Sequence, residues 1–148
     1  MPDNPSKKIL ITGASGMLGL NLCKTLSREG FDVLGAYNSN PELITANVEK
    51  LKLDITLREA VMDVAKKYPI IGAIIHCAAL TNPDQCEKDQ QTCHKINVEG
   101  TKNIVRLAEI LGAKLIFIST PMVFSGDEGD YTEESVPRPL NYYAETKL

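Results

Sequence analysis

The sequence has no long run of lysine or arginine and only a small excess of charge. Its 16 basic and 19 acidic residues give a net charge of -3, and its pI is about 5.4. A weakly acidic protein is not drawn electrostatically to the phosphates of nucleic acids or of anionic lipids. The charge therefore predicts that neither nucleic acid nor a membrane surface is a partner.

The sequence also lacks the features of an exported or membrane-bound protein. No stretch approaches the roughly 20 apolar residues that span a bilayer, and the polar residues 1–8 lack the apolar core of a signal peptide. Cys23, Cys77, Cys86 and Cys93 form no C-x-x-C pair. In a protein without a signal peptide, the default is four reduced thiols that pack as small hydrophobic side chains. We therefore expect a cytoplasmic protein.

No metal-ligand spacing is present either. His76 and His94 form no zinc-binding pattern with the cysteines. The acidic residues between 128 and 134 are more typical of a solvated loop than of a divalent-ion site. We predict no bound metal.

Strand-like and helix-like segments alternate along the chain. Short apolar runs predict strands at residues 8–12, 32–36, 50–53, 73–76 and 114–118. Apolar residues at helical spacing predict helices over 18–30 and 57–68, and a long helical tract that ends near residue 112. Nearly continuous apolar strands that alternate with helices indicate a parallel sheet covered on both faces. The 148 residues, 43% of them apolar, therefore predict one α/β domain with a doubly wound sheet, truncated after about five strands.

A glycine-rich turn, G-x-x-G-x-x-G over residues 13–19, follows the first predicted strand and opens the first predicted helix. Glycines let the backbone approach a pyrophosphate, and a helix N-terminus presents free N–H groups to it. The alternative is a tight turn without a ligand. The position between strand and helix favours a dinucleotide site.

A second motif lies at the other end of the chain, where Tyr143 and Lys147 are four residues apart. On a helix they share one face, so the ammonium can sit beside the phenol and make it a usable proton donor or acceptor near neutrality. Residues 119–140, which precede this helix, have no strand or helix period and carry several glycines, prolines and acids. A long loop after a strand of an α/β sheet is typical of a ligand site.

The glycine spacing and the terminal Y-x-x-x-K resemble the extended branch of the short-chain dehydrogenase/reductase superfamily, which acts on nucleotide sugars. Residues 76–79 (His-Cys-Ala-Ala) resemble that family's Asn-Ala-Ala segment, with His76 in place of the usual Asn. Residues 96–101 resemble its Asn-Val-x-Gly-Thr segment. The resemblance covers nearly the whole chain and implies a Rossmann-type NAD(P)-binding domain over residues 1–148.

Within that branch, the chain is most similar to the dTDP-4-dehydrorhamnose reductase group. Residues 78–87 are similar to its Ala-Ala-x-Thr-x-Val-Asp-x-x-Glu pattern, and residues 119–126 to its Ser-Thr-Asp-Tyr-Val-Phe-x-Gly pattern. Two departures weaken the substrate assignment, because Pro121 stands where that group has Asp and Pro83 where it has Val. The resemblance implies an NAD(P)H-dependent reductase of a nucleotide-linked 4-keto-6-deoxysugar.

The same resemblance implies the site residues. Tyr143 would donate a proton to the carbonyl oxygen as hydride arrives, Lys147 would assist it and hold the ribose, and Thr120 would polarise the carbonyl, with Ser119 as the fallback. Asn97 would hold a water near the lysine. The implied cofactor-binding residues are Gly13, Ser15, Gly16, Met17, Leu18, Gly19, Asp54, Ile55, Cys77, Ala78, Ala79, Tyr143 and Lys147.

The choice of cofactor is less specified. Asp54 occupies the position where the family's acid contacts the adenine amino group, although a helix N-cap explains it equally well. Residues 37–40, after the second strand, offer neither the acid that binds a ribose 2′-OH nor the base that binds a 2′-phosphate. The resemblance favours NADP(H) over NAD(H).

The end of the sequence suggests a larger protein. A helix from about residue 141 to 148 has barely two turns, which is too short to be stable alone. Our hypothesis is that the chain is the cofactor half of a protein about twice as long, with a carboxyl-terminal substrate region and with a homodimer considered for the whole. We expect the 148-residue chain alone to bind NADP(H) weakly and to turn over no substrate, because Tyr143 and Lys147 would lie on a fraying end.

Two other functions stay open. A sugar-nucleotide epimerase or dehydratase of the same superfamily is the first, but dehydratases carry an acid pair beside the active threonine, which Pro121 and Met122 do not supply. The second is a non-catalytic regulatory subunit that keeps the fold and the cofactor pocket, as the methionine adenosyltransferase beta subunit does.

Overall fold

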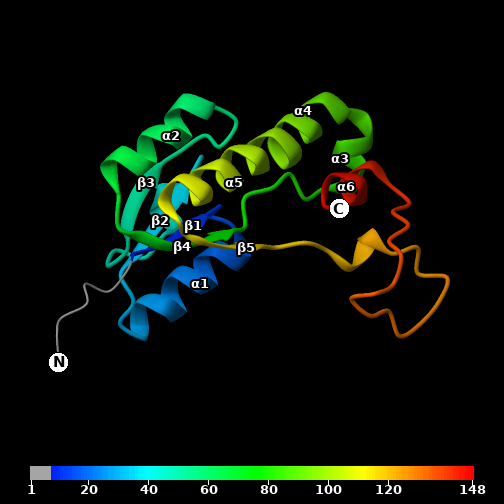
Figure 1. The fold of residues 1–148 in the computed structure, drawn as a ribbon, viewed down its shortest axis with the longest axis horizontal. Coiled ribbons are helices and arrows are strands. Elements are labelled where there is room, and N and C mark those ends of the chain that lie inside the picture. Colours follow the sequence, from blue (N-terminus) through cyan, green and yellow to red (C-terminus); the bar gives the residue numbers. More distant parts are fainter. Residues whose placement is uncertain (1–7) are drawn as a thin grey trace.

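The computed structural model describes residues 8–148, so the signal-peptide prediction for the N-terminus falls outside the described residues except at Lys8. Five parallel strands form one sheet, in the order β3-β2-β1-β4-β5 (Figure 1). They are β1 (Lys8–Thr12), β2 (Val33–Tyr37), β3 (Glu49–Lys52), β4 (Ile71–His76) and β5 (Lys114–Phe117). In the central register, Ile11 of β1 pairs with Gly35 of β2 on one side and with Ile75 of β4 on the other. The predicted doubly wound parallel sheet is confirmed.

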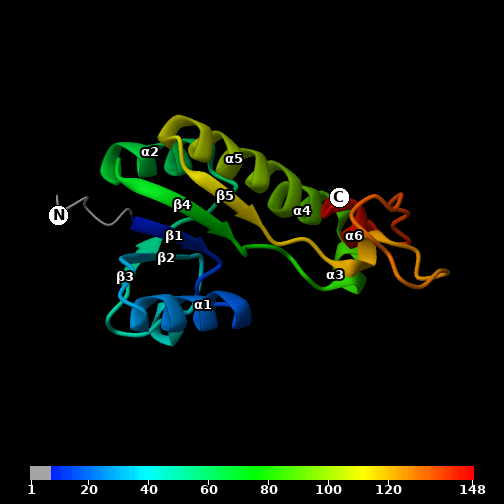
Figure 2. The ribbon, with the colours of Figure 1, turned by 60° about the horizontal axis from the view of Figure 1, so that its bottom comes forward.

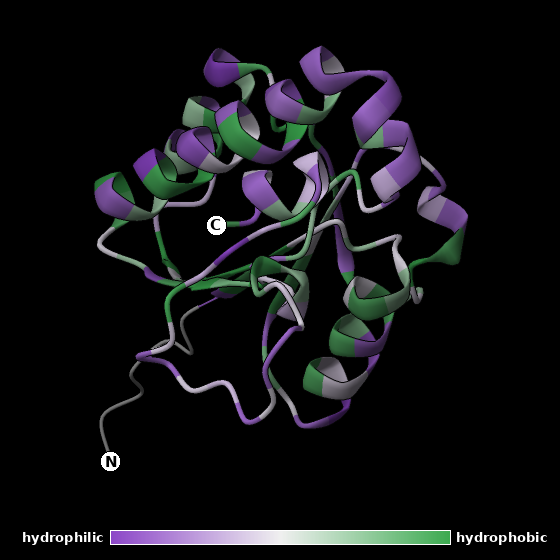
Figure 3. Ribbon diagram, turned by 90° about the vertical axis from the view of Figure 1, so that its right-hand side faces the viewer, coloured by the Kyte–Doolittle hydropathy of each residue, from purple (hydrophilic) through white to green (hydrophobic). Residues whose placement is uncertain are grey.

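Helices cover both faces of this sheet, as Figure 2 shows. Helix α1 (Met17–Arg28) lies on one face, and α2 (Arg58–Lys67) and α5 (Gly100–Leu111) lie on the other. Leu10 and Ile74 belong to the larger core beneath α2 and α5, whereas Ile11 and Cys23 belong to the core beneath α1. Alternate residues of the central strands therefore supply two separate hydrophobic layers, so these strands are apolar throughout. Figure 3 shows the helices with hydrophilic residues on their outer sides and hydrophobic residues among those turned toward the sheet.

The long helical tract predicted before residue 112 is divided. It contains α3 (Pro83–Lys88), α4 (Gln90–His94), a π-helical turn (Lys95–Glu99) and α5. The break lies at Asp89, whose backbone leaves the helical region at φ -136° and whose side chain accepts a hydrogen bond from the Thr92 N–H. An aspartate that caps a new helix in this way competes with continuation of the preceding one. The predicted bounds of the first strand agree with those of β1, and the other strand bounds differ from the observed ones by at most two residues.

The predicted ordered loop over residues 119–140 is irregular except for one 3₁₀ turn (Pro121–Val123), and it leads to α6 (Tyr142–Thr146). Helix α6 packs against α3 and α4 (Figure 1). The Glu87 carboxylate accepts a hydrogen bond from the Tyr142 N–H at 2.6 Å, and Ala144 is completely buried. The expected fraying end is therefore not what the structure shows, because tertiary packing holds this short helix.

No helix within residues 8–148 is both long enough and apolar enough to cross a membrane.

Candidate functional site

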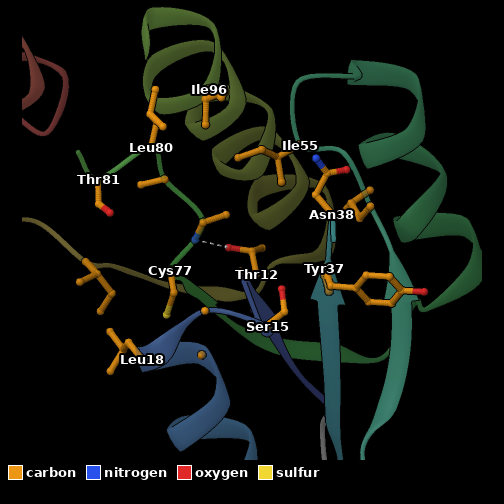
Figure 4. A pocket seen from close by; sticks show the side chains of 18 of the residues that line it. Thr12, Ser15, Leu18, Tyr37, Asn38, Ile55, Cys77, Leu80, Thr81 and Ile96 are labelled. Atoms are coloured by element: carbon orange, nitrogen blue, oxygen red, sulfur yellow. Dashed lines mark hydrogen bonds between the residues drawn. The ribbon is translucent and has the colours of Figure 1, made fainter. Parts of the chain in front are cut away.

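A cavity of about 620 Å³ opens where the carboxyl ends of β1, β2 and β4 meet. Figure 4 shows its wall, with Ser15 and Leu18 on the glycine-turn side and Cys77 and Leu80 after β4. All thirteen residues that the sequence assigns to the cofactor line this one cavity. The other lining residues are Thr12, Ala36, Tyr37, Asn38, Ser39, Leu53, Thr56, Leu80, Thr81, Ile96, Ile118 and Ser119.

The glycine turn is sterically required at two positions. A Cβ on Gly19 would lie 2.2 Å from the Gly13 carbonyl oxygen, and Gly13 itself has a φ of +65° with the Ala78 backbone 2.8 Å from where its Cβ would stand. These contacts let the turn lie directly against the segment after β4. The glycine spacing is therefore explained by close backbone packing as well as by a ligand.

The N-terminus of α1 has the features of an anion-binding site. Gly16 is the N-cap and supplies no side-chain hydrogen bond, and the first turn contains no acidic residue. Met17, the first helical residue, is 85% exposed. The free N–H groups of this helix end face the cavity, where they and the helix dipole fit the diphosphate of a dinucleotide.

Asp54 and Ile55 form the wall beyond β3. The Asp54 Oδ1 accepts hydrogen bonds from the Thr56 N–H at 2.9 Å and the Thr56 hydroxyl at 2.8 Å. Helix α2 begins at Arg58, with Leu57 as its N-cap, so the N-cap interpretation of Asp54 is wrong. Asp54 instead lies in the cavity wall, and its contact with an adenine stays a prediction.

His76, the last residue of β4, is 1% exposed, and each of its ring nitrogens is hydrogen-bonded to a threonine. Its Nδ1 lies 2.6 Å from Thr12 Oγ1, and its Nε2 lies 3.0 Å from Thr101 Oγ1. The Thr101 hydroxyl donates its proton to the Asn97 carbonyl, so it accepts from the His76 Nε2–H. Nδ1 then accepts from the Thr12 hydroxyl, whose oxygen accepts from the Ala78 N–H at 3.2 Å, the bond drawn in Figure 4.

These partners fix a neutral tautomer of His76 that carries its proton on Nε2. Burial, with repulsion from the Lys147 ammonium as the smaller cause, lowers the pKa of His76 to about 4. The ring therefore acts as a fixed bridge between β1 and α5 at neutral pH. The two ring nitrogens lie on opposite sides of the imidazole, so one ring can reach both Thr12 and Thr101.

Tyr143 and Lys147 line the same cavity as the glycine turn. Tyr143 is 8% and Lys147 5% exposed. The Lys147 Nζ lies 4.2 Å from the centre of the Phe117 ring, which is a cation–π contact. Burial lowers the pKa of Lys147. Within residues 8–148 this ammonium forms no ion pair, and Lys147 is one of the residues that line the cavity.

The two candidate hydroxyls are placed differently. Ser119 lines the cavity, and its Oγ donates to the Lys147 carbonyl oxygen at 2.9 Å. Thr120 is not part of the cavity wall; its hydroxyl accepts from the Met122 N–H at 3.3 Å and caps the 3₁₀ turn. The structure thus brings the fallback residue, and not Thr120, beside Tyr143 and Lys147. The catalytic role of either hydroxyl stays a prediction.

Asn97 does not reach the cavity and is instead a buried connector. Its side chain accepts from the Leu80 N–H at 2.8 Å, donates to the Leu80 carbonyl at 3.0 Å and donates to Thr146 Oγ1 at 2.9 Å. These bonds attach the segment after β4 to α6. Asn97 therefore positions the wall that carries Leu80 and the helix that carries Tyr143.

The prediction of four reduced thiols is wrong, because Cys86 of α3 and Cys93 of α4 form a disulfide. The break at Asp89 turns α4 back so that the two sulfurs meet. Cys23 and Cys77 are free, and burial raises the pKa of both thiols. The cytoplasmic prediction loses the support that four reduced thiols gave it.

Sequence reasoning missed Thr12, Thr101 and Phe117. Each has an ordinary local explanation, since a threonine or a phenylalanine is common in strands and a threonine is unremarkable on a helix. Only their positions around His76 and Lys147 reveal their roles. Within residues 8–148, no group of three or more His, Cys, Asp or Glu side chains is arranged to hold a metal ion.

Comparison with known proteins places this site in context. Residues 7–148 match the RmlD substrate binding domain family. Methionine adenosyltransferase 2 subunit beta of Xenopus laevis is 36% identical over 146 residues, which are 97% of this chain and 41% of that protein.

Two solved structures are similar in both sequence and fold. A hypothetical dTDP-4-dehydrorhamnose reductase from Sulfolobus tokodaii is 39% identical with a TM-score of 0.84, covering 95% of this chain and 49% of that chain. The dTDP-4-dehydrorhamnose reductase of Bacillus anthracis, in complex with NADP, is 36% identical with a TM-score of 0.81, covering 96% of this chain and 46% of that one. The chain spans less than half the length of these three proteins.

Proposed function

This chain belongs to the RmlD substrate binding domain family, in the extended short-chain dehydrogenase/reductase superfamily, and we propose that it is the cofactor-binding part of an NAD(P)H-dependent reductase acting on a nucleotide-linked 4-keto-6-deoxysugar. The observation that carries the proposal is that the glycine turn, Tyr143 and Lys147 all line one cavity. One bound dinucleotide can then contact an anion-binding helix end and a proton donor together. The dTDP-4-dehydrorhamnose reductase structures support the substrate class.

The residues of this chain have separate roles in the proposal. The N–H groups at the start of α1 bind the diphosphate, and Asp54 contacts the adenine. When bound, the reduced nicotinamide supplies a hydride to the substrate carbonyl carbon. Tyr143 gives its phenolic proton to the carbonyl oxygen, so that hydride and proton together convert the ketone into an alcohol.

The surroundings of Tyr143 assist this transfer. Lys147 is a buried positive charge in the cavity lining. In the proposal it binds the ribose and favours negative charge on the phenol oxygen once the proton has left. Ser119, which lines the cavity, is the hydroxyl proposed to donate to the substrate carbonyl, and to do so it must release the Lys147 carbonyl oxygen to which it donates at 2.9 Å. Thr120 is the alternative from the family resemblance.

The proposal includes a longer protein. The three relatives described above are more than twice as long as the stretch they share with this chain. We propose that the remainder encloses the sugar nucleotide, and that NADP(H) is preferred to NAD(H).

Replacement of Tyr143 by Phe tests the assignment in the full-length protein. Loss of the hydroxyl removes the proton donor but keeps the ring, so turnover of NADPH with a dTDP-4-dehydro-6-deoxysugar is expected to fall by at least about 100-fold. The dissociation constant for NADPH is expected to change by no more than about threefold. Unchanged turnover in this variant would disprove the catalytic role of Tyr143.

A regulatory subunit is the second candidate, favoured by 36% identity to a methionine adenosyltransferase beta subunit. It retains NADP(H) binding but consumes no NADPH with the keto-sugar. Binding of NADPH without consumption, together with tight association with a methionine adenosyltransferase catalytic subunit, would favour this function over the reductase.

A further inference from the structure

Lys52, the last residue of β3, lies next to the turn that follows β2. It pairs with Tyr37 in the parallel ladder, and its Nζ lies 5.8 Å from the centre of the Tyr37 ring. The same Nζ donates to the backbone carbonyl of Asn38 and lies 3.3 Å from the Asn38 Oδ1. Tyr37 and Asn38 both line the cavity, and Figure 4 shows them on the side opposite Leu80. An ammonium group therefore stands next to the cavity wall.

This charge was invisible in the sequence around β2. Residues 37–40 are uncharged, so the sequence predicts neither an acid nor a base at the position that usually distinguishes the two nicotinamide cofactors. Parallel strands place their carboxyl ends side by side. The sheet thus delivers to the end of β2 a lysine that is fifteen positions later in the sequence than Tyr37.

The charges around Lys52 leave its ammonium available. Asp54 is the acid of the cavity wall, and its Oδ1 is already bonded twice by Thr56. Glu49, at the start of the same strand, accepts from Lys8 at 2.9 Å and from Tyr68 at 2.8 Å. Within residues 8–148, Lys52 makes its hydrogen bonds and its cation–π contact only with uncharged groups, those of Asn38 and the Tyr37 ring. Its side chain is exposed, so it can turn without backbone movement.

We infer that Lys52 selects the phosphorylated cofactor by binding a phosphate on the adenosine ribose 2′-oxygen, with the Asn38 side chain beside it. This inference rests on the proposed function, since it requires a dinucleotide in the cavity. A 2′-phosphate carries up to two negative charges and accepts strong charge-assisted hydrogen bonds, whereas a 2′-hydroxyl gains little from an ammonium. Residues 38–41, which directly follow β2, contain no carboxylate to bind the hydroxyl form.

The test compares dissociation constants for NADPH and NADH, measured by calorimetry on the full-length protein, in native form and as Lys52→Gln. Loss of one charged contact is expected to weaken NADPH binding about tenfold while NADH changes by no more than about twofold. Lys52→Arg keeps the charge and is expected to keep the preference. Lys50→Gln is the matched control, because Lys50 is on the same strand but its Nζ bonds the Pro41 carbonyl at 2.9 Å.

A second measurement removes the nicotinamide from the comparison. Adenosine 2′,5′-bisphosphate is expected to bind more tightly than 5′-AMP to the native protein, and Lys52→Gln is expected to abolish most of that difference. An unchanged NADPH-to-NADH ratio in Lys52→Gln would overturn the role of Lys52 while leaving the proposed function intact. Binding of neither dinucleotide to the native protein would overturn both.

Discussion

Acidification of the protein tests the buried hydrogen-bond bridge at His76. The pKa of His76 is lowered from 6.5 to about 4 because the folded protein buries the ring and holds it near the Lys147 ammonium. Above pH 6.5 the imidazole is neutral in both folded and unfolded chains, so its titration has no effect there. Between pH 6.5 and 4 the unfolded chain takes up a proton that the native chain refuses, so stability falls as the pH falls.

The expected magnitude follows from the two pKa values. A shift of this size corresponds to about 3 kcal/mol of unfolding free energy when fully developed. About 2 kcal/mol of it is lost between pH 7 and pH 5, and the loss levels off below the folded-state pKa of about 4. Other groups also titrate over this range, so the contribution of His76 has to be isolated by comparison with a variant.

His76→Asn is the variant, since it puts a non-titrating amide at the position where the resembled family usually has Asn. Urea denaturation at pH 7, 6 and 5, followed by circular dichroism because the chain contains no tryptophan, gives the unfolding free energy of each form. The native protein is expected to lose about 2 kcal/mol more than the variant between pH 7 and pH 5. His94→Asn, which removes an exposed imidazole, is the control for the substitution itself.

Equal losses in the native protein and in His76→Asn, within about 0.5 kcal/mol, would refute the reasoning. In that case the ring would be protonated inside the folded protein, and the neutral tautomer that bridges Thr12 and Thr101 would be wrong. A lower overall stability of the variant at all pH values would not affect the comparison, because the test depends on the difference between two pH values.

Two further predictions concern the turn and the disulfide. Gly19→Ala would place a Cβ 2.2 Å from the Gly13 carbonyl oxygen, so it is expected to lower the unfolding free energy by about 1–3 kcal/mol and to weaken NADPH binding. The control is Gly129→Ala, which has open space around the new methyl group and is expected to change the unfolding free energy by less than about 0.5 kcal/mol. Equal effects of the two substitutions would contradict the packing argument. The Cys86–Cys93 disulfide joins residues seven apart in sequence, and its reduction is expected to lower the unfolding free energy by about 2 kcal/mol. Urea denaturation that is the same with and without dithiothreitol would contradict the pairing.

Much of the fold was predictable because its causes are local. Apolar strands, helical spacing and the glycine turn identified all five strands of the sheet and its parallel order, with strand bounds in error by at most two residues. The division of the long helical tract was not predicted. Its cause is a cap at Asp89, and an aspartate within a helix-like pattern gives no sign of whether its side chain will bond a backbone N–H.

The candidate site divides in the same way. The motifs around Gly13, Asp54, Cys77 and Tyr143 identified residues that the structure gathers around one cavity, because parallel strands bring their carboxyl ends to one edge of the sheet. Of the two adjacent hydroxyl residues, the family resemblance assigned Thr120 to the site, but Ser119 is the one that lines the cavity. Neighbouring residues in an extended segment point in opposite directions, and only the packing of the loop fixes which one faces inward.

The sequence by itself determined the five strands and the motif residues that line the cavity, because periodicity, glycine spacing and side-chain type are properties of short segments. The tertiary structure alone decided which distant groups meet. It joined His76 to Thr12 and Thr101, paired Cys86 with Cys93, and brought Lys52 behind the end of β2. Such contacts depend on strand register and helix packing over long sequence separations, and no local pattern encodes them.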